Sequence, residues 1–348
     1  MPPRPVTAQD LIRLRGVSDS QISPDGRRVA FVVTTASEDK DEYLSNVWVV
    51  DVATASPRPF TAGPTRDTAP RWSPDGRWLA FVSDRGPKKK PQLYVMPADG
   101  GEPVVLTDLA NGLFGQWGAT WSPDSTRLAF LSAVGGWQEP EREDERGKSQ
   151  PARVITTLKY RFEAMGFTYD RRPHVFVVPV TGAAPTQITS GDFPDAFPTW
   201  SPDGTRIAFV SERHETREVD IVDAIYVVAA DGGEPTRVSP ILQPMWYPTF
   251  SPDGRSIGYC GMVQPQDGRN FHVFRQPLDG GDPVCLTAAL DRSAWDMVRL
   301  AWSPDGEWLH FVGRDHGTYP LYRVRAKGGE VPMPVLAGRR AVLGFSIA

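Results

Sequence analysis

The chain has 348 residues, of which 40% are hydrophobic and 23% charged, and this balance excludes a disordered chain. A formal net charge of −4 leaves no basic footprint for nucleic acid, and no apolar run approaches the roughly 18 residues that span a membrane. We therefore expect no nucleic-acid partner and no membrane attachment. The N-terminus lacks the apolar stretch of a secretory signal, so the sequence predicts a cytoplasmic protein.

The first predicted element is a short amphipathic helix in an N-terminal leader, residues 1–18. Thr7 and Asp10 have the spacing of a capping box, and Gly16 is suited to end the helix. Leucine and isoleucine side chains between these positions give the helix one apolar side. Such a helix packs on the edge of the remaining fold or docks on another domain, and the residues leave both open.

The tetrapeptide Ser-Pro-Asp-Gly recurs through the rest of the chain. Its copies begin at Ser23, Ser73, Ser201, Ser251 and Ser303, and a further copy at Ser122 has serine in place of glycine. Proline at the second position and glycine at the fourth are typical of a tight turn. Successive copies are 49–52 residues apart, except for 79 between the third and fourth. The chain therefore repeats one unit six times, with a single insertion.

Each unit has the pattern of four short antiparallel strands. The turn is followed by a strand-like run such as Trp78–Ser83 and then by a second such as Leu93–Pro97. A glycine-rich hairpin, as at 99–103, leads to a last strand that ends near threonine. Four strands per repeat are typical of a propeller blade. We predict an all-β fold, a β-propeller of four-stranded antiparallel blades over residues 19–348, in preference to a β-sandwich with accidental repeats.

The insertion, residues 135–174, lies in the third predicted blade. Its first half is a charge run typical of a solvated segment, whereas aromatic residues alternate with arginines in its second half. Long loops on a rigid scaffold often carry function. The candidate substrate-binding residues are Arg161, Phe162, Glu163, Arg171 and Arg172. The alternative is a hairpin that packs against a neighbouring domain or subunit.

The two cysteines, Cys260 and Cys285, fall on the second and fourth predicted strands of the fifth blade. One strand lies between them, so they are about 10 Å apart, whereas a disulfide requires Cα atoms within about 7 Å. We predict free, mostly buried thiols, which suit a reducing compartment.

The C-terminal residues resemble the beginning of another repeat. Val342–Ser346 has the same character as the residues that precede the motif at Ser303, and it predicts the first strand of a seventh blade. The expected fold is thus six complete blades plus this strand, a propeller that is incomplete at its C-terminus. The alternative is a six-bladed ring in which this tail closes on a neighbouring blade.

The sequence offers no recognisable catalytic group. There is no nucleophile elbow, Gly-x-Ser-x-Gly; Gly344–Ala348 comes nearest but ends in alanine. None of the five histidines has metal-ligand spacing, and the aspartates of the repeated turns are explained by turn hydrogen bonds. We therefore assign no catalytic residue, no metal ligand and no cofactor, and whether the protein is an enzyme stays open.

The repeated turn and its following strand, as in Leu79–Ser83, resemble the propeller repeats of the prolyl oligopeptidase family and of TolB-type proteins. The leader from Leu11 to Ser23 resembles the start of acylaminoacyl-peptidase-like members, and 154–178 resembles their third-blade insertion. The resemblance covers nearly the whole chain. It implies a seven-bladed propeller followed by an α/β-hydrolase domain with a Ser-Asp-His triad, and no member of that triad can be placed on these residues.

The same resemblance implies a non-catalytic role for this chain. The propeller would cap the active site of a serine peptidase, admit short peptides and exclude folded proteins. The expected partners are the α/β-hydrolase domain of the same protein and short peptides, with self-association into a homo-oligomer as a further expectation. Arg161, Arg171 or Arg172 would hold a peptide's C-terminal carboxylate or acyl oxygen; otherwise these arginines form salt bridges.

Two other functions remain as alternatives. One is a stand-alone interaction scaffold of the TolB type. The other is a propeller enzyme with its site in the central funnel, which would need acid or base side chains on the inner strands. The inner strands directly before the motif, such as Pro198–Trp200, contain no carboxylate or histidine.

Overall fold

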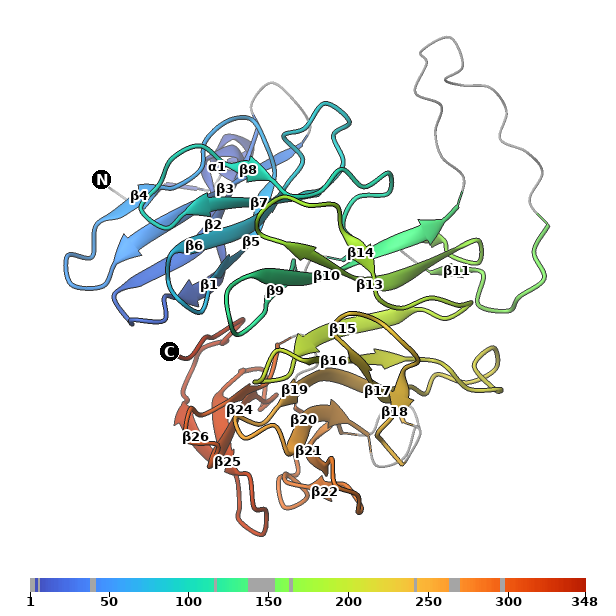
Figure 1. The fold of residues 1–348 in the computed structure, drawn as a ribbon. Helices are drawn as coiled ribbons and strands as arrows, with labels where there is room; N and C mark the ends of the chain where they lie inside the picture. The colour runs from blue at the N-terminus through green and yellow to red at the C-terminus, as the bar shows by residue number, and fades with distance from the viewer. Residues whose placement is uncertain are drawn as a thin grey trace.

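The computed structural model describes residues 4–5, 7–37, 42–115, 118–136, 154–162, 165–240, 243–262, 270–294 and 298–348. Within these residues the chain is a six-bladed β-propeller of four-stranded antiparallel sheets with one short helix (Figure 1). The all-β prediction and its six blades are confirmed. No helix of the described part has the length and hydropathy of a membrane span.

Each of the first three blades runs from an inner strand to an outer edge strand. Blade 1 contains β1 (Arg15–Ile22), β2 (Arg28–Ala36), β3 (Tyr43–Asp51) and β4 (Pro57–Pro59). Blade 2 contains β5 (Asp67–Trp72), β6 (Trp78–Ser83), β7 (Gln92–Pro97) and β8 (Val104–Val105). Blade 3 contains β9 (Thr120–Trp121), β10 (Arg127–Gly135), β13 (Arg171–Pro179) and β14 (Thr186–Gln187).

The last three blades repeat this order. Blade 4 contains β15 (Asp195–Trp200), β16 (Arg206–Ser211), β17 (Ala224–Ala229) and β18 (Thr236–Arg237). Blade 5 contains β19 (Met245–Phe250), β20 (Ser256–Gly261), β21 (His272–Pro277) and β22 (Val284–Cys285). Blade 6 contains β23 (Ala301–Trp302), β24 (Trp308–Val312), β25 (Leu321–Arg325) and β26 (Met333–Leu336).

The repeated motif closes the turn between the first two strands of every blade. In blade 2 the Ser73 hydroxyl donates to Asp75 Oδ1 at 2.6 Å and accepts the Trp78 N–H at 2.9 Å. In blade 4, the hydrogen bond from the Ser201 hydroxyl, followed by that from the Thr205 N–H, lowers the pKa of Asp203 to about 2. These contacts support the interpretation that the motif aspartates are turn residues.

The tryptophan before the motif joins each blade to the previous one. The Trp72 indole N–H donates to the Gln21 carbonyl at 3.0 Å, across the boundary between blades 2 and 1. The same bond recurs from Trp121, Trp200 and Trp302 to Arg71, Thr120 and Thr249. In blade 5, Phe250 has no such donor, but the Arg206 guanidinium lies over its ring as Arg28 and Arg127 lie over Trp72 and Trp200.

The hydrophobic core lies between neighbouring blades. In each of five clusters, buried side chains of one blade interdigitate with those of the next, as Val47 and Val49 of blade 1 do with Leu79 and Phe81 of blade 2. No such cluster joins blades 6 and 1 among the described residues. A cavity of about 450 Å³ lies there instead, lined by parts of β1 and β5 and by residues 343–345.

The N-terminal helix α1 (Ala8–Arg13) begins as predicted and ends earlier. The Asp10 carboxylate accepts the Thr7 N–H at 2.8 Å, so the capping box is confirmed. Gly16 does not end the helix, because Leu14 is already extended and Arg15 begins β1. Strand pairing with β2 is therefore already established at Arg15, one residue before the expected stop.

The predicted first strand of a seventh blade is not formed, since residues 342–348 contain no strand. A strand requires a hydrogen-bonded neighbour along its length. Here Val342 N–H donates to the Tyr319 carbonyl at 2.9 Å, and the Ser346 hydroxyl accepts the Ile22 N–H at 2.9 Å. The tail therefore bridges blade 6 and blade 1.

Both cysteines are free, as predicted. Cys260 is buried in β20 and Cys285 is partly buried in β22, with β21 between them.

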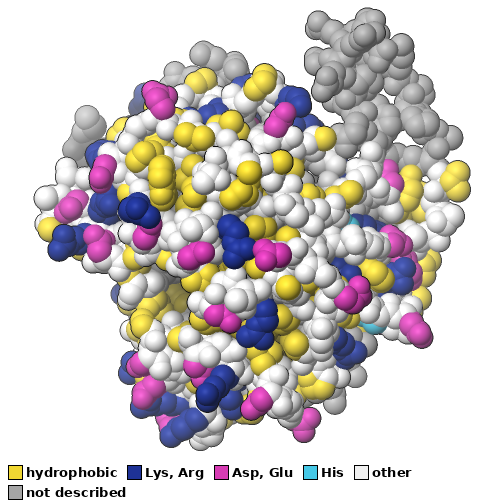
Figure 2. Space-filling model, viewed as in Figure 1, with side chains coloured by type: hydrophobic (Ala, Val, Ile, Leu, Met, Phe, Trp, Pro, Cys, Tyr) yellow, Lys and Arg dark blue, Asp and Glu magenta, His cyan; other side chains and the backbone are white. Residues whose placement is uncertain are grey.

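The surface carries charges of both signs. Figure 2 shows basic and acidic side chains interspersed over the visible face, with no area of a single sign of charge.

Candidate functional site

The insertion extends the central hairpin of blade 3. Strands β10 and β13 pair without a break from Arg127 with Pro179 to Gly135 with Arg171. The described part of the insertion adds a small hairpin, β11 (Arg161–Phe162) with β12 (Gly166–Phe167), beside this pair (Figure 1). The insertion is thus carried on a continuous ladder rather than on a loose loop.

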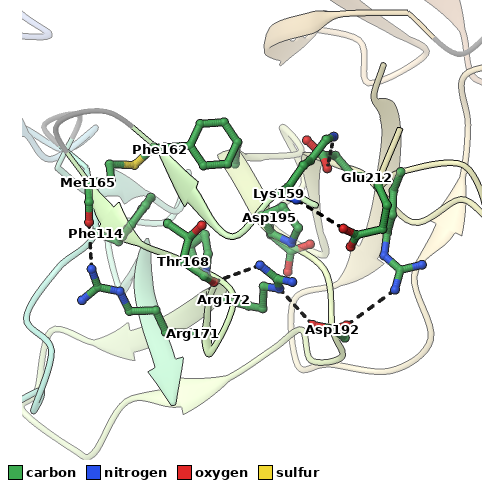
Figure 3. Close-up of a pocket in the computed structure, with 15 residues that line it drawn as sticks. Phe114, Lys159, Phe162, Met165, Thr168, Arg171, Arg172, Asp192, Asp195 and Glu212 are labelled. Carbon is green, nitrogen blue, oxygen red and sulfur yellow. Dashed lines mark hydrogen bonds and ion pairs between the residues drawn. The ribbon is translucent and has the colours of Figure 1, made fainter. Parts of the chain in front are cut away.

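Three of the predicted site residues come together. Phe162, Arg171 and Arg172 line one cavity of about 180 Å³ between the insertion and blade 4 (Figure 3). Arg161 does not line it; its exposed guanidinium lies 5.9 Å from the centre of the Phe167 ring. The fifth candidate, Glu163, lies outside the described residues.

The two arginines at the start of β13 are hydrogen-bonded within the chain. Arg171 donates from Nε to the Phe167 carbonyl at 2.9 Å and from a terminal nitrogen to the Met165 carbonyl at 2.8 Å. Arg172 donates to Asp192 at 2.9 Å and to the Thr168 carbonyl at 2.9 Å. These contacts orient the insertion, and for Arg172 they include the salt bridge that was the alternative to carboxylate binding.

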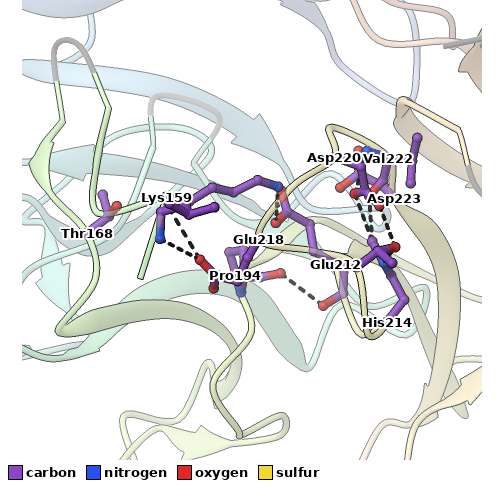
Figure 4. Close-up of polar contacts among 12 residues, drawn as sticks. Lys159, Thr168, Pro194, Glu212, His214, Glu218, Asp220, Val222 and Asp223 are labelled. Carbon is purple, nitrogen blue, oxygen red and sulfur yellow. Dashed lines mark hydrogen bonds and ion pairs between the residues drawn. The ribbon is translucent and has the colours of Figure 1, made fainter. Parts of the chain in front are cut away.

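Blade 4 supplies the opposite wall through the loop between β16 and β17. Lys159 of the insertion forms an ion pair with Glu212 at 2.8 Å, and Glu218 accepts the Leu158 N–H at 3.0 Å (Figure 4). We did not predict this contact between the insertion and blade 4. The sequence feature that could have indicated it is the segment 212–223, which is longer and more charged than the loop 84–91 at the same place in blade 2.

A fully buried carboxylate forms part of the cavity wall. Asp195, the first residue of β15, accepts the Thr189 hydroxyl at 2.5 Å and the Arg213 guanidinium at 2.9 Å, and lies 3.0 Å from His174 Nδ1. His174 and Thr189 belong to blade 3, so the network ties the insertion-bearing blade to blade 4. Asp195 could not be recognised from the sequence, because nothing in its local pattern marks it as buried.

A second carboxylate close to the Lys159–Glu212 pair is partly buried. Burial, followed by the negative charge of Glu212, raises the pKa of Asp223 to about 7. The Asp223 backbone exchanges hydrogen bonds with Gln243, which fixes the position of the side chain beside the pair. Figure 4 shows Asp223 next to Asp220 and His214 on this loop.

The inner strands carry a β-bulge that the sequence did not reveal. Asp19, Ala69, Phe197 and Tyr247 have positive φ values of 47–55° at equivalent places in blades 1, 2, 4 and 5. In blade 3 the position is Gly118, where a Cβ would lie 2.6 Å from that of Ala69. These positions therefore face one another across neighbouring blades.

The residues directly before each motif contain no carboxylate, but the inner strands of blades 1, 2 and 4 begin earlier in the chain and carry aspartates there. Asp19, Asp67 and Asp195 lie on β1, β5 and β15, and each is paired with an arginine. Near the pair of Asp19 with Arg71, burial and the positive charge of Arg71 lower the pKa of Arg299 to about 10. Among the described residues, no group of three histidine, cysteine or acidic side chains is arranged to hold a metal ion.

Comparisons with known proteins agree with this architecture. Residues 13–157 match a family described as the TolB beta propeller domain, PD40. The chain is 34% identical over 356 residues to the "Uncharacterized peptidase YuxL" of Bacillus subtilis (strain 168), covering 99% of this chain and 53% of that protein. It is 25% identical to a "Dipeptidyl-peptidase 5" of Porphyromonas gingivalis, covering 98% of this chain and 51% of that protein.

A solved structure of an acylaminoacyl peptidase in complex with Z-Gly-Gly-Phe-chloromethyl ketone superposes with a TM-score of 0.73 and 18% identity, over 97% of this chain and 49% of that one. The fold is thus that of a TolB-type β-propeller. The chain is similar in sequence to proteins named as peptidases, in line with the sequence resemblance, and the likeness to the solved acylaminoacyl peptidase shows a shared propeller fold. It spans about half the length of the curated relatives it matches.

Proposed function

We propose that this chain is the non-catalytic propeller of an acylaminoacyl-peptidase-like serine peptidase, and that it controls the access of short peptides to an α/β-hydrolase domain outside these residues. One observation carries the proposal: 34% identity across 99% of the chain to about half of a peptidase. The nucleophile and its partners would belong to the hydrolase domain, and this chain would supply the entrance.

The construction of the propeller supports a role in selection by size. Tryptophan hydrogen bonds and shared apolar clusters hold neighbouring blades together. At the inner bulges the Phe197 and Tyr247 rings lie 4.6 Å apart between their centres, so side chains fill the space between these inner strands. A rigid, narrow entrance would pass an extended peptide and exclude a folded domain.

The proposal also covers compartment and partners. Two free thiols in a chain of this size suit the reducing cytoplasm, which is the compartment we propose. Short peptides and the hydrolase domain are the proposed partners. Exposed apolar side chains of the insertion, including Val154, Leu158 and Tyr160, support self-association of the complete protein.

Among the predicted arginines, Arg161 is the one best suited to hold a substrate carboxylate. Its side chain is exposed and forms no hydrogen bond or ion pair with other described residues, whereas Arg171 and Arg172 are engaged. In the complete enzyme, Arg161→Ala should lower kcat/KM about tenfold or more for peptides with a free C-terminus relative to amidated ones. An unchanged preference would overturn this assignment.

Arg58→Ala is the matched control for that variant. Arg58 is likewise exposed and lies 5.9 Å from the centre of a phenylalanine ring, that of Phe60, but on the outer strand of blade 1. This variant should leave the preference between free and amidated peptides unchanged.

Size selection is tested on the complete polypeptide that carries this chain. Peptides of increasing length and one folded protein with exposed cleavable termini are supplied at equal concentrations. Short peptides should be hydrolysed and the folded protein spared until it is unfolded. Equal rates for the folded and unfolded protein would contradict a gating role.

The second candidate is a stand-alone TolB-like interaction scaffold. It is favoured by the TolB family match over residues 13–157. The two functions differ in whether the protein reacts with a serine-hydrolase reagent, which is the measurement described at the end of the Discussion.

A further inference from the structure

The cavity between the insertion and blade 4 is bounded by two separate parts of the fold. Its insertion side is held in place by Lys159, which pairs with Glu212, and by the Leu158 N–H, which donates to Glu218 (Figures 3 and 4). Its other side is formed by the first residues of β15 and by the segment before them. The cavity therefore exists only while the insertion is docked.

Apolar groups make up much of the cavity wall. Phe114, Phe162 and Met165 line it from blade 3 and the insertion, and Pro194 and Ala196 line it from blade 4. Phe162 and Met165 are 45% and 44% exposed, so the apolar wall continues to the surface of the molecule. A ligand can thus reach the cavity from solvent without displacing the core.

The charged groups around the cavity are already engaged within the chain, most of them in ion pairs. Asp192 accepts from Arg172 at 2.9 Å and lies 3.5 Å from Arg217, and Lys159 is paired with Glu212. Arg171 is committed to two backbone carbonyls. A charged ligand would have to break these pairs, at the cost of leaving a charge without its partner. An uncharged apolar group would leave every pair intact and lose only contact with water.

The volume limits the size of that group. A dry apolar cavity of about 150 Å³ accommodates benzene. The cavity here is about 180 Å³, which is room for one phenyl or isobutyl group. It is too small for a folded segment of another protein.

We infer that this cavity binds one uncharged apolar side chain of a peptide, of the size of phenylalanine or leucine. The inference rests on the proposed function for its choice of a peptide as the ligand. It adds a side-chain preference that is built into the propeller chain itself, away from any residue that would perform the cleavage.

The test is a titration of the 348-residue chain with N-acetyl amides of single amino acids. Binding is monitored through the NMR chemical shifts of the methionine methyl groups. The phenylalanine and leucine amides should bind saturably, and the glycine and glutamate amides should bind at least tenfold more weakly. Equal binding of the phenylalanine and glycine amides would overturn the inference.

Variants locate the binding. Ala196→Leu fills the cavity and should weaken binding of the phenylalanine amide at least tenfold, whereas Ala183→Leu, in an exposed loop of blade 3, should leave it unchanged. If Ala196→Leu does not fold, Phe162→Ala removes an exposed wall instead and should weaken binding at least threefold. Binding that neither foldable variant weakens would place the ligand elsewhere and overturn the inference.

The failure of this inference is distinguishable from failure of the proposed function. The titration uses no catalytic activity, so a positive result stands even if no hydrolase domain is found. If the titration shows no binding but the complete protein does hydrolyse peptides, only the inferred binding of an apolar side chain is contradicted, and the proposed function stands.

Discussion

Blades 2 and 4 contain the same buried ion pair in different surroundings. In blade 2, Asp67 begins the inner strand and pairs with Arg85 at 2.8 Å; in blade 4, Asp195 does so with Arg213 at 2.9 Å. Both aspartates are fully buried, and in both blades the arginine follows the second strand by two residues. The shared pair therefore belongs to the scaffold.

The difference lies in what is added around the pair. Asp67 receives a long contact of 3.4 Å from Asn46 of blade 1, whereas Asp195 is contacted by His174 and Thr189 of blade 3. The loop that follows is also longer in blade 4 and holds the insertion through Glu212 and Glu218. A repeated scaffold thus acquires a specific site where neighbouring loops are lengthened, while its strands stay the same.

The largest effect should come from removing the two aspartates in turn. Asp195→Ala leaves Arg213 buried without its partner and should cost about 3–5 kcal/mol of the free energy of unfolding. Asp67→Ala should cost less, because Arg85 is more exposed and fewer groups from the neighbouring blade lose a partner. Urea denaturation measures both values. A larger loss of unfolding free energy for Asp67→Ala would show that the added contacts in blade 4 do not make its ion pair the more important one.

The next effect concerns pH and is specific to blade 4. Because burial raises the pKa of Asp223 to about 7, the folded chain keeps a proton between about pH 4 and 7 that the unfolded chain has released. The unfolded state therefore binds fewer protons in this window, and stability falls as the pH rises through it. Asp223→Asn should remove this loss and raise stability at pH 8 by about 1–3 kcal/mol.

Thermal unfolding of the two proteins from pH 4 to pH 8 measures this difference. The advantage of Asp223→Asn should be smallest at pH 4 and grow toward pH 8. The control is Asp231→Asn, since Asp231 has a side chain that is 93% exposed. An advantage of Asp223→Asn that does not change with pH would show that the carboxyl is not protonated in the folded chain.

The smallest effect on stability should come from the contact that docks the insertion. Lys159→Ala removes a partly exposed ion pair and should change the free energy of unfolding by about 1 kcal/mol or less. Hydrogen exchange of residues 154–162 should nevertheless become faster, since this segment loses its anchor on blade 4. Lys88→Ala, which removes a weaker and more exposed pair with Asp108, serves as the control. Unchanged exchange would show that the ion pair does not hold the insertion.

Much of the fold could be predicted because the turn chemistry repeats. The positions of Ser73, Asp75 and Gly76 have the same roles in each copy, with Ser125 in place of the glycine in blade 3, so one interpretation applies to six places in the chain. The bulges could not be predicted, since Phe197 and Tyr247 adopt positive φ although their side chains do not favour it. These positions contact one another across neighbouring blades, as the Phe197 and Tyr247 rings do, and such tertiary contacts leave no local signal in the sequence.

The site was predictable only in part, for a similar reason. Phe162, Arg171 and Arg172 were recognised from their composition, and they do line one cavity. Asp192, which pairs with Arg172, and Glu212, which pairs with Lys159, come later in the chain in an ordinary-looking blade. They meet the insertion only through tertiary packing. The hydrogen bonds that engage Arg171 depend on the local hairpin geometry, which composition does not specify.

The central claim, that this propeller acts within a serine peptidase, is tested most directly by the intact mass of the native polypeptide with this N-terminus after its source lysate is labelled with a serine-hydrolase probe. The propeller chain alone has a mass of 38.4 kDa. We expect a labelled species that is larger by a hydrolase domain of about 250 residues. An unlabelled species of 38.4 kDa would contradict it and favour the stand-alone scaffold.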